Sequence, residues 1–271
     1  MLKLASFDLE ISKELPDKQC PVCLSENVMT VEKQSLCRDC GKFGSIYDFR
    51  SDWKNHRPLG ITCAALMADK TQQKYTPDFW WQNPKMNKGT CQKVAHDLCE
   101  LSERYKIITW NGLNFDFDVL AEESGMYKEC AELALNHIDL MLIVVTMRGH
   151  WLGLDKAAKG ANIQGKLKNV ILSDGAPLND MSGGKAPGLW KAGEYKAVLD
   201  YLADDVRVTL ELAQWIEKNK RIQWISDKGY EQSFKVPKLY TVKECLELSR
   251  DTIPHWVTNP IELKSMMEWI K

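Results

Sequence analysis

The first residues of the chain carry a nearly continuous apolar run. Residues 2–11 have the length and composition of a buried strand. Side chains alternate between the two faces of a strand, so Asp8 and Glu10 are expected on the same face. Two carboxylates held this close repel each other and resist joint ionisation, and a fold that keeps them together usually places a cation between them. The pattern therefore predicts a cation site on this strand.

The remaining pattern switches repeatedly between strand-like and helix-like periods. Short apolar runs predict strands at residues 60–68, 75–81 and 106–110, and apolar residues at helical spacing predict the helices between them. This order predicts an α/β fold. The expected helices cover residues 90–105, 115–123, 138–148, 154–161 and 198–212, and the Gly-, Asp- and Pro-rich residues 165–189 are expected to form a long loop that could cover a cleft.

Two of these elements present further acidic positions. Asp116 lies where the strand at 106–110 gives way to a helix, and is therefore near a strand end. In the helix at 198–212, a spacing of four residues places Tyr201 and Asp205 one turn apart on one face. Four carboxylates and a phenol could thus converge on one point.

Neighbouring polar residues are expected to have other roles. Asp118 and Asp204 are predicted to be surface charges, with Asp204 about 100° around its helix from Asp205. His137 and Asp139, at the start of an apolar helix, are predicted to be capping or packing residues.

Composition limits the classes of protein that fit. With 271 residues, of which 44% are hydrophobic and 27% charged, the chain can bury one core and a small additional module. Its most apolar stretch, residues 138–147, is too short to cross a bilayer, and residues 1–4 do not resemble a secretory signal, so a cytoplasmic location is expected.

The charge balance restricts how the chain could bind nucleic acid. The net charge is −1, so affinity for nucleic acid cannot come from the overall charge and must come from local patches. Four lysines that could line a groove are Lys156, Lys159, Lys166 and Lys168.

Four of the nine cysteines form two closely spaced pairs. Cys20 and Cys23 are separated by thirteen residues from the second pair, Cys37 and Cys40. Two such pairs suit one tetrahedral thiolate site and are typical of a zinc ribbon. Four thiolates leave no open position for water, so one structural Zn²⁺ is expected, in an insertion at residues 13–58. The basic residues around it could bind a nucleic-acid strand, or the insertion could serve only its own folding.

The acidic motifs together resemble the DEDD superfamily of 3′–5′ exonucleases. Residues 7–10 (Phe-Asp-Leu-Glu) resemble its first motif, residues 111–116 (Asn-Gly-Leu-Asn-Phe-Asp) its second, and residues 201–205 (Tyr-Leu-Ala-Asp-Asp) its third. The tyrosine subclass fits, because Asp200 stands where the other subclass has histidine. The second motif is most similar to that of the proofreading domain of family B DNA polymerases and of related stand-alone exonucleases. The resemblance covers most of residues 1–12 and 59–215.

This resemblance implies a ribonuclease H-like (DnaQ-like) fold, with a mixed central sheet flanked by helices, and two Mg²⁺ or Mn²⁺ ions. Asp8 would bridge both ions, Glu10 and Asp205 would hold the ion that activates water, and Asp116 would act at the second. Tyr201 would orient the attacking water, since a neutral phenol is a poor base.

Substrate contacts are assigned to four residues. Asn111 and Phe115 are expected to shape the pocket for the terminal nucleotide, and Leu9 to contact its base. Lys185 lies in a Gly183-Gly184-Lys185 sequence that lacks the Ser or Thr of a P-loop, but it could contact a substrate phosphate.

The expected organisation is a single exonuclease domain over residues 1–271, with residues 221–271 as an extension packed on its core. The expected activity is removal of nucleoside 5′-monophosphates from the 3′ ends of single-stranded DNA, with a separate polymerase or a replication or repair factor as a possible partner. Two alternatives remain open: an RNA 3′-end exonuclease, because the metal chemistry does not depend on the sugar, and a non-catalytic nucleic-acid-binding zinc-ribbon protein.

Overall fold

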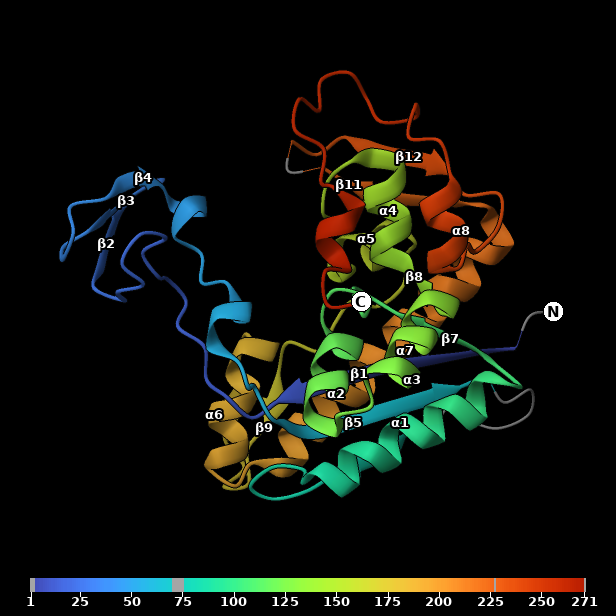
Figure 1. Ribbon diagram of the computed structural model, residues 1–271, viewed down its shortest axis with the longest axis horizontal. Coiled ribbons are helices and arrows are strands. Elements are labelled where there is room, and N and C mark those ends of the chain that lie inside the picture. Colours follow the sequence, from blue (N-terminus) through green and yellow to red (C-terminus); the bar gives the residue numbers. More distant parts are fainter. Residues whose placement is uncertain (1–2, 70–75, 227, 271) are drawn as a thin grey trace. The chain divides into compact units, whose positions relative to one another are not determined.

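The computed structural model describes residues 3–69, 76–226 and 228–270. Two expected strands include residues outside these ranges: Leu2 in the strand at 2–11 and Tyr75 in the strand at 75–81. The first and last residues of the expected domain at 1–271 also lie outside them. The chain forms two compact units (Figure 1). One contains Met1–Ser12 with Gly60–Lys271, and the other contains Lys13–Leu59.

The larger unit is built on a five-stranded sheet with the order β6-β5-β1-β7-β8. The central strand β1 pairs with β5 in antiparallel and with β7 in parallel orientation, and β8 continues the parallel part. The sheet is therefore mixed, as expected. Its strands are β1 (Leu4–Ile11), β5 (Ile61–Ala68), β6 (Asp78–Trp81), β7 (Lys106–Thr109) and β8 (Ile138–Asp139).

Helices cover both faces of this sheet. Ser6 on β1 donates a side-chain hydrogen bond to the Val206 carbonyl of α7 (2.5 Å), whereas the adjacent Phe7 packs against Phe117 of α2. Because neighbouring side chains alternate, Asp8 and Glu10 share the face of Ser6 and lie on the α7 side. The helices are α1 (Lys88–Ser102), α2 (Asp116–Ser124), α3 (Tyr127–Asn136), α4 (Leu140–Arg148), α5 (Leu154–Gly160), α6 (Ala186–Lys191), α7 (Tyr195–Asn219) and α8 (Val242–Glu247).

Three parts of the sequence-based assignment differ from the structure. The helix expected from residue 138 begins at Leu140, because Ile138 and Asp139 complete the sheet as β8. Helix α3 was not expected, since it buries only small or isolated apolar residues. The segment 165–189 is not entirely loop: it contains β9 (Val170–Ile171), β10 (Pro177–Leu178), a 3₁₀ turn η3 (Gly183–Lys185) and the start of α6. Gly and Pro, which predicted a loop there, are tolerated in a first helical turn.

The chain after α7 forms a hairpin and then irregular segments. Strands β11 (Arg221–Ile225) and β12 (Glu231–Lys235) pair in antiparallel orientation, and a capping box formed by Thr241 and Glu244 begins α8. After the short turn η4 (Leu263–Met266), Trp269 donates its indole N–H to the Leu113 carbonyl (2.8 Å). This hydrogen bond connects the segment at Trp269 to the loop that precedes α2.

The smaller unit has a three-stranded sheet with two 3₁₀ turns. Its core consists of Cys20, Cys37 and Phe49, with the half-buried Val28 packed against them. The chain leaves β1 and returns to β5 through paired backbone positions, where the Ser12 N–H donates to Gly60 O and the Lys13 N–H to Leu59 O, both at 3.1 Å. The elements are β2 (Val28–Val31), β3 (Gln34–Cys37), β4 (Phe43–Ser45), η1 (Ile46–Phe49) and η2 (Trp53–His56).

Candidate active site

Three carboxylates converge in the larger unit. Asp8 and Glu10 extend from β1, and Asp205 extends from the face of α7 that covers this strand. One oxygen from each lies within 4.8 Å of the other two. The period of two in the strand and the packing of α7 on β1 are sufficient to produce this cluster. Oxygen donors at such a separation suit a hard divalent cation such as Mg²⁺ or Mn²⁺.

The fourth predicted carboxylate adjoins this group through Asp8. Asp116 is the first residue of α2, and its Oδ1 accepts the Leu9 backbone N–H at 3.1 Å. Asp116 also adjoins Asp8, whose charge adds to burial in raising the pKa of Asp116. Two carboxyl groups this close resist joint ionisation.

Burial and mutual repulsion oppose ionisation of these groups. Burial, reinforced by Asp8, raises the pKa values of Glu10 and Asp116 well above their ordinary ranges. Burial also raises the pKa of Asp205 to about 7, although the ammonium of Lys166 acts in the opposite direction. A bound divalent cation would reverse this situation by favouring the charged forms.

A lysine supplies positive charge to the cluster. Lys166 Nζ lies 2.5 Å from Asp205 Oδ2 and 5.1 Å from the centre of the Tyr201 ring. Burial lowers the pKa of this lysine, but Asp205, Tyr201 and Asp8 outweigh that effect and raise it. The other oxygen of Asp205, Oδ1, is buried and has no hydrogen-bond partner among the described residues. A buried carboxylate oxygen without a donor is suited to a metal ion.

Tyr201 lies beside Asp205, one helical turn earlier on α7. Its side chain is buried, and Lys166 Nζ lies 5.1 Å from the centre of its ring. Burial, followed by the charge of Asp205, raises the pKa of the phenol. Tyr201 is therefore neutral, and its hydroxyl can orient a polar group but cannot act as an ionised base.

The loop before α2 is held by a single carboxylate. Asp139, completely buried, accepts the backbone N–H groups of Asn111 (2.9 Å) and Leu113 (3.0 Å). It also accepts those of Met141 (2.9 Å) and Leu142 (3.2 Å) as the N-cap of α4. The predicted capping role of Asp139 is confirmed, and the same side chain also positions the second motif, which its sequence context did not indicate.

Replacing Asp139 by alanine is expected to destabilise the protein by about 3–5 kcal/mol, because four backbone donors would lose their acceptor in a buried site. Urea unfolding monitored by circular dichroism measures this. Asp200→Ala is the control, because Asp200 is exposed and pairs with Lys196 on its own helix. Equal stability of the two variants would contradict the expectation.

The predicted substrate-contact residues occupy different positions. Asn111 has a positive φ of 75°, and its Oδ1 is buried without a hydrogen-bond partner in the described part of the chain. Phe115 is half-buried as the N-cap of α2, and Leu9 is buried. Lys185 is exposed and donates to Asn179 O at 3.2 Å.

Gly183, two residues before Lys185, also lies near the cluster. A Cβ added at Gly183 would lie 3.6 Å from Glu10 Oε2. The segment that was expected to cover a cleft therefore passes beside a cluster carboxylate.

Two neighbouring aspartates differ from the expected surface charges. Asp118 is only 1% exposed, because α2 is covered over nearly its whole length, so the prediction of a surface charge was wrong. Asp204 is partly buried and accepts the Leu167 N–H (2.6 Å) while pairing with Arg207 (2.8 Å). These contacts position the segment that carries Lys166. No local pattern could have revealed them, since Asp204 and Leu167 are distant in sequence.

The four paired cysteines converge in the smaller unit. Their sulfur atoms lie within 4.8 Å of one another, with Cys20 Sγ 3.5 Å from Cys40 Sγ and Cys23 Sγ 3.6 Å from Cys37 Sγ. Burial opposes ionisation of Cys20, but backbone N–H groups of Cys23 and Val22 lower its pKa to about 6. Thiolate donors in this arrangement fit a structural zinc ion.

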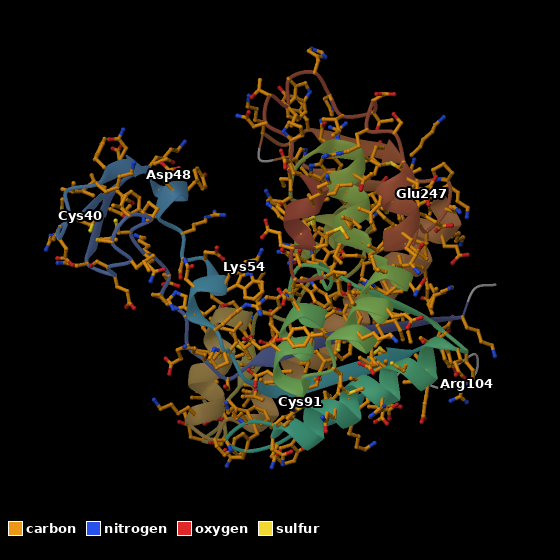
Figure 2. All side chains as sticks on the ribbon, in the orientation of Figure 1. Cys40, Asp48, Lys54, Cys91, Arg104 and Glu247 are labelled. Carbon is orange, nitrogen blue, oxygen red and sulfur yellow. The ribbon has the colours of Figure 1, made fainter. Side chains whose placement is uncertain are left out.

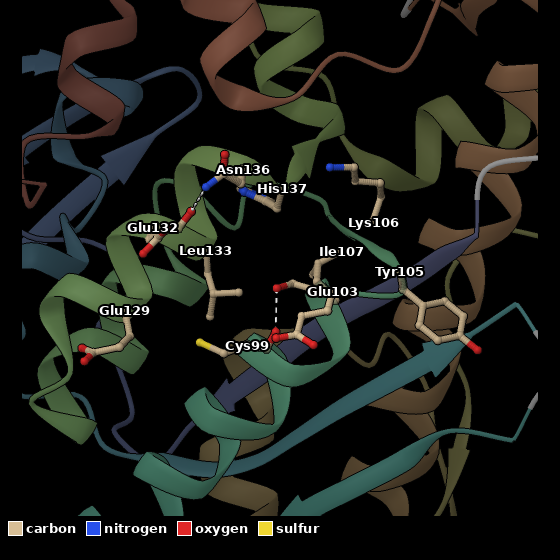
Figure 3. Close-up of a pocket in the computed structure, with 11 residues that line it drawn as sticks. Cys99, Glu103, Tyr105, Lys106, Ile107, Glu129, Glu132, Leu133, Asn136 and His137 are labelled. Atoms are coloured by element: carbon tan, nitrogen blue, oxygen red, sulfur yellow. Dashed lines mark hydrogen bonds between the residues drawn. The ribbon is translucent and has the colours of Figure 1, made fainter.

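A separate cavity of about 430 Å³ lies at the beginning of β7 (Figure 3). It is lined by residues of α1, α3 and β7, among them Cys99, Lys106 and Glu129. Asp116 follows the opposite end of the same strand, so this cavity does not belong to the carboxylate cluster. Figure 2 shows all the described side chains on the same fold.

Comparison with known protein families places the chain in one superfamily. A model described as the RNase_H superfamily matches residues 55–217, more than half of the chain, and the chain therefore belongs to this superfamily. The match begins after Asp8 and Glu10, so it does not include them. No curated protein matches the chain. No helix in the described ranges combines the length and apolar character needed to cross a membrane.

Several solved structures are distantly similar. The family B DNA polymerase of the archaeon Pyrobaculum calidifontis is 14% identical, with a TM-score of 0.46, over 80% of this chain and 24% of the polymerase. Exonuclease I of E. coli in complex with an oligonucleotide is 11% identical, with a TM-score of 0.32, over 81% of this chain and 41% of the exonuclease. The chain thus spans less than half the length of either protein.

Proposed function

We propose that the protein is a metal-dependent 3′–5′ exonuclease. The observation that carries the proposal is the convergence of Asp8, Glu10 and Asp205, with Asp116 adjoining Asp8, in a chain of the RNase H superfamily. Four oxygen-donor side chains that resist ionisation without a cation form a poor structural core and a suitable metal site. The tyrosine in the third motif supports the tyrosine subclass of DEDD exonucleases.

The four carboxylates would hold two Mg²⁺ or Mn²⁺ ions. When bound, such ions neutralise the scissile phosphate, lower the pKa of water and stabilise the leaving 3′-alkoxide. Tyr201 would orient the attacking water through its neutral hydroxyl. Lys166, already beside Asp205, would contribute positive charge facing the phosphate.

The terminal nucleotide would occupy the space beside the loop before α2. Asn111 would offer its unpaired Oδ1 as an acceptor, and Phe115 would pack against the sugar or base. Leu9 and Lys185 would make further contacts, Leu9 with the base and Lys185 with a phosphate. The proposed substrate is the 3′ end of single-stranded DNA, and the proposed product is a nucleoside 5′-monophosphate, because the second motif most resembles that of DNA polymerase proofreading domains.

Incubation with a 5′-labelled single-stranded DNA oligonucleotide tests this proposal. Products that shorten progressively from the 3′ end, only in the presence of Mg²⁺ or Mn²⁺, would support it. Degradation of RNA but not of matched DNA would replace the proposed substrate while retaining the site. Absence of cleavage of both would favour a non-catalytic nucleic-acid-binding protein.

Lys166→Ala is expected to lower kcat on single-stranded DNA by about 10- to 100-fold, because it removes the cation beside the scissile phosphate. Single-turnover cleavage measures the chemical step. Lys168→Ala is the matched control, since Lys168 is exposed and pairs with Asp155 at 3.6 Å, outside the cluster. A similar loss in both variants would show that Lys166 has no particular role.

Tyr201→Phe is expected to lower kcat by about tenfold while retaining measurable activity, because the metal ions and not the phenol would activate the water. Comparison of its rate with that of Asp205→Asn under identical conditions measures the difference. If the tyrosine variant were as inactive as the aspartate variant, a role limited to orientation would be wrong.

A further inference from the structure

An arginine lies between two tryptophans in the larger unit, at the C-terminal end of α4. The Arg148 guanidinium carbon is 5.6 Å from the centre of the Trp224 ring and 5.9 Å from that of Trp256. The ring of His150 lies 6.4 Å from Trp224 and 6.1 Å from Trp256. Trp224 is buried on β11, whereas Trp256 is 60% exposed.

The Arg148 guanidinium lies beside aromatic rings, and in the described part of the chain it donates no hydrogen bond to an acceptor. A guanidinium carries five N–H donors and remains charged. Arg148 is half-buried, and its Nε is buried without a hydrogen-bond partner. Within residues 3–69, 76–226 and 228–270, no carboxylate forms an ion pair with it. Because the side chain as a whole is only half-buried, its remaining N–H donors can meet an acceptor from outside the chain.

Helix capping does not account for Arg148. Two of the last carbonyls of α4 receive side-chain donors from other residues: Arg250 donates to Val145 O (3.3 Å) and Thr252 to Met147 O (3.3 Å). The N–H of Gly149, which has a positive φ of 75°, also donates to Val145 O, and Ile261 N donates to Gly149 O, both at 2.9 Å. These donors to the helix end all come from residues other than Arg148.

The ligand class follows from the two kinds of group present. A guanidinium binds phosphate through paired N–H donors, and an exposed indole provides a flat surface on which a base can stack. Trp151, 47% exposed, adds a second indole in the segment that follows Arg148. Phosphate and base occur together in single-stranded nucleic acid.

The distance to the carboxylate site is compatible with one continuous strand. Asp139, at the start of α4, holds the loop of Asn111 and Leu113 that adjoins the site. The nine residues of α4 separate Asp139 from the far end at Arg148 by about 13 Å. Figure 1 shows α4 running from β8 towards β11 and β12. A nucleic-acid strand with its 3′ end at the carboxylates would need only a few nucleotides to extend as far as Arg148.

We propose that Arg148, Trp256 and Trp151 form a second binding site, which contacts single-stranded nucleic acid a few nucleotides upstream of the 3′ end. The placement upstream rests on the proposed exonuclease function, whereas binding of a single strand does not. Arg148 pairs with a backbone phosphate and Trp256 stacks with a base.

Binding of labelled oligothymidylates of about three and about twelve nucleotides by the full-length protein tests this, with Asp8→Asn in all variants so that nothing is cut. Arg148→Gln and Trp256→Ala are each expected to raise the Kd of the longer oligonucleotide about tenfold and to leave that of the shorter one unchanged. Arg148→Gln should also reduce the slope of log K against log salt by about 0.7, the value for one phosphate of a single strand.

Matched variants separate binding from structural effects. Arg221→Gln removes another arginine that stacks on a tryptophan, Trp215 at 5.8 Å, and should leave both affinities unchanged. Arg148→Lys and Trp256→Phe, which keep the charge and the ring, should restore most of the affinity.

Wild-type affinity for the longer oligonucleotide in Arg148→Gln and Trp256→Ala would overturn the inference. The inference would also fail if these substitutions raised the Kd values of both oligonucleotides equally, or if Arg221→Gln had the same effect as Arg148→Gln. It would fail as well if the parent protein did not bind the longer oligonucleotide. If the protein with Asp8 restored binds but cuts no substrate, the exonuclease proposal fails while these affinities still decide the binding site.

Discussion

Asp8→Asn and Asp205→Asn are each expected to reduce the rate of 3′–5′ hydrolysis about 10³-fold or more. Each substitution replaces a carboxylate by a neutral amide of the same shape and so removes a charge that a divalent cation requires. Asp8 has the greater expected effect, because it belongs to the cluster with Glu10 and Asp205 and also adjoins Asp116. Cleavage of a 5′-labelled oligonucleotide at saturating Mg²⁺ or Mn²⁺ measures the loss.

Two controls separate this effect from unfolding. Asp200 lies on the same helix as Asp205, is 50% exposed and pairs with the exposed Lys196, so the activity of Asp200→Asn should be unchanged. The free energy of unfolding of Asp205→Asn is measured beside its activity, because the substitution also removes the charged partner of Lys166 at 2.5 Å. Retained activity in Asp8→Asn would exclude the proposed metal site.

Removal of metal from the four cysteines is expected to unfold Lys13–Leu59 and leave the larger unit folded. The smaller unit has a core of only Cys20, Cys37 and Phe49, with Val28 beside them, and two of these residues are proposed ligands. Structural zinc contributes about 10–16 kcal/mol in small domains, far more than such a core supplies. Hydrogen exchange should show rapid exchange confined to residues 13–59 in Cys37→Ser.

The matched control for this second prediction is Cys99→Ser. Cys99 lies in the larger unit, on the cavity at the start of β7, and is not part of the cysteine cluster. Its substitution should preserve one zinc per chain by elemental analysis, whereas Cys37→Ser should release it. Slow exchange throughout residues 13–59 without zinc would show that the unit folds independently of the metal.

The principal carboxylates were predictable because each depends on a short-range rule. The period of two places Asp8 and Glu10 together, and the spacing of four places Tyr201 beside Asp205; the structure then requires only that α7 pack on β1. The α/β class followed from the order of apolar segments, and the mixed sheet was implied by the resemblance to the DEDD exonucleases. The cysteine cluster followed from pair spacing, since the ligands of one tetrahedral site occur in characteristic pairs.

Other features depend on packing between distant segments. Lys166 was one of four candidate lysines, and only its contact with Asp205 distinguishes it from Lys168. The burial of Asp118 depends on the elements that cover α2, which its local sequence does not specify. Asp139 was expected to cap a helix, but its bonds to the loop at Asn111 require β7 and β8 to lie side by side. In each case the partner, not the residue type, determines the role.

The paired backbone bonds at Ser12 and Gly60 have a consequence for engineering. Strands β1 and β5 are antiparallel neighbours, and the chain leaves one and re-enters the other through adjacent positions. The cysteine-bearing unit is thus an enlarged hairpin connection. A tight turn of about two residues could replace Lys13–Leu59 without changing the register of the sheet, and the excised unit could be grafted onto another hairpin.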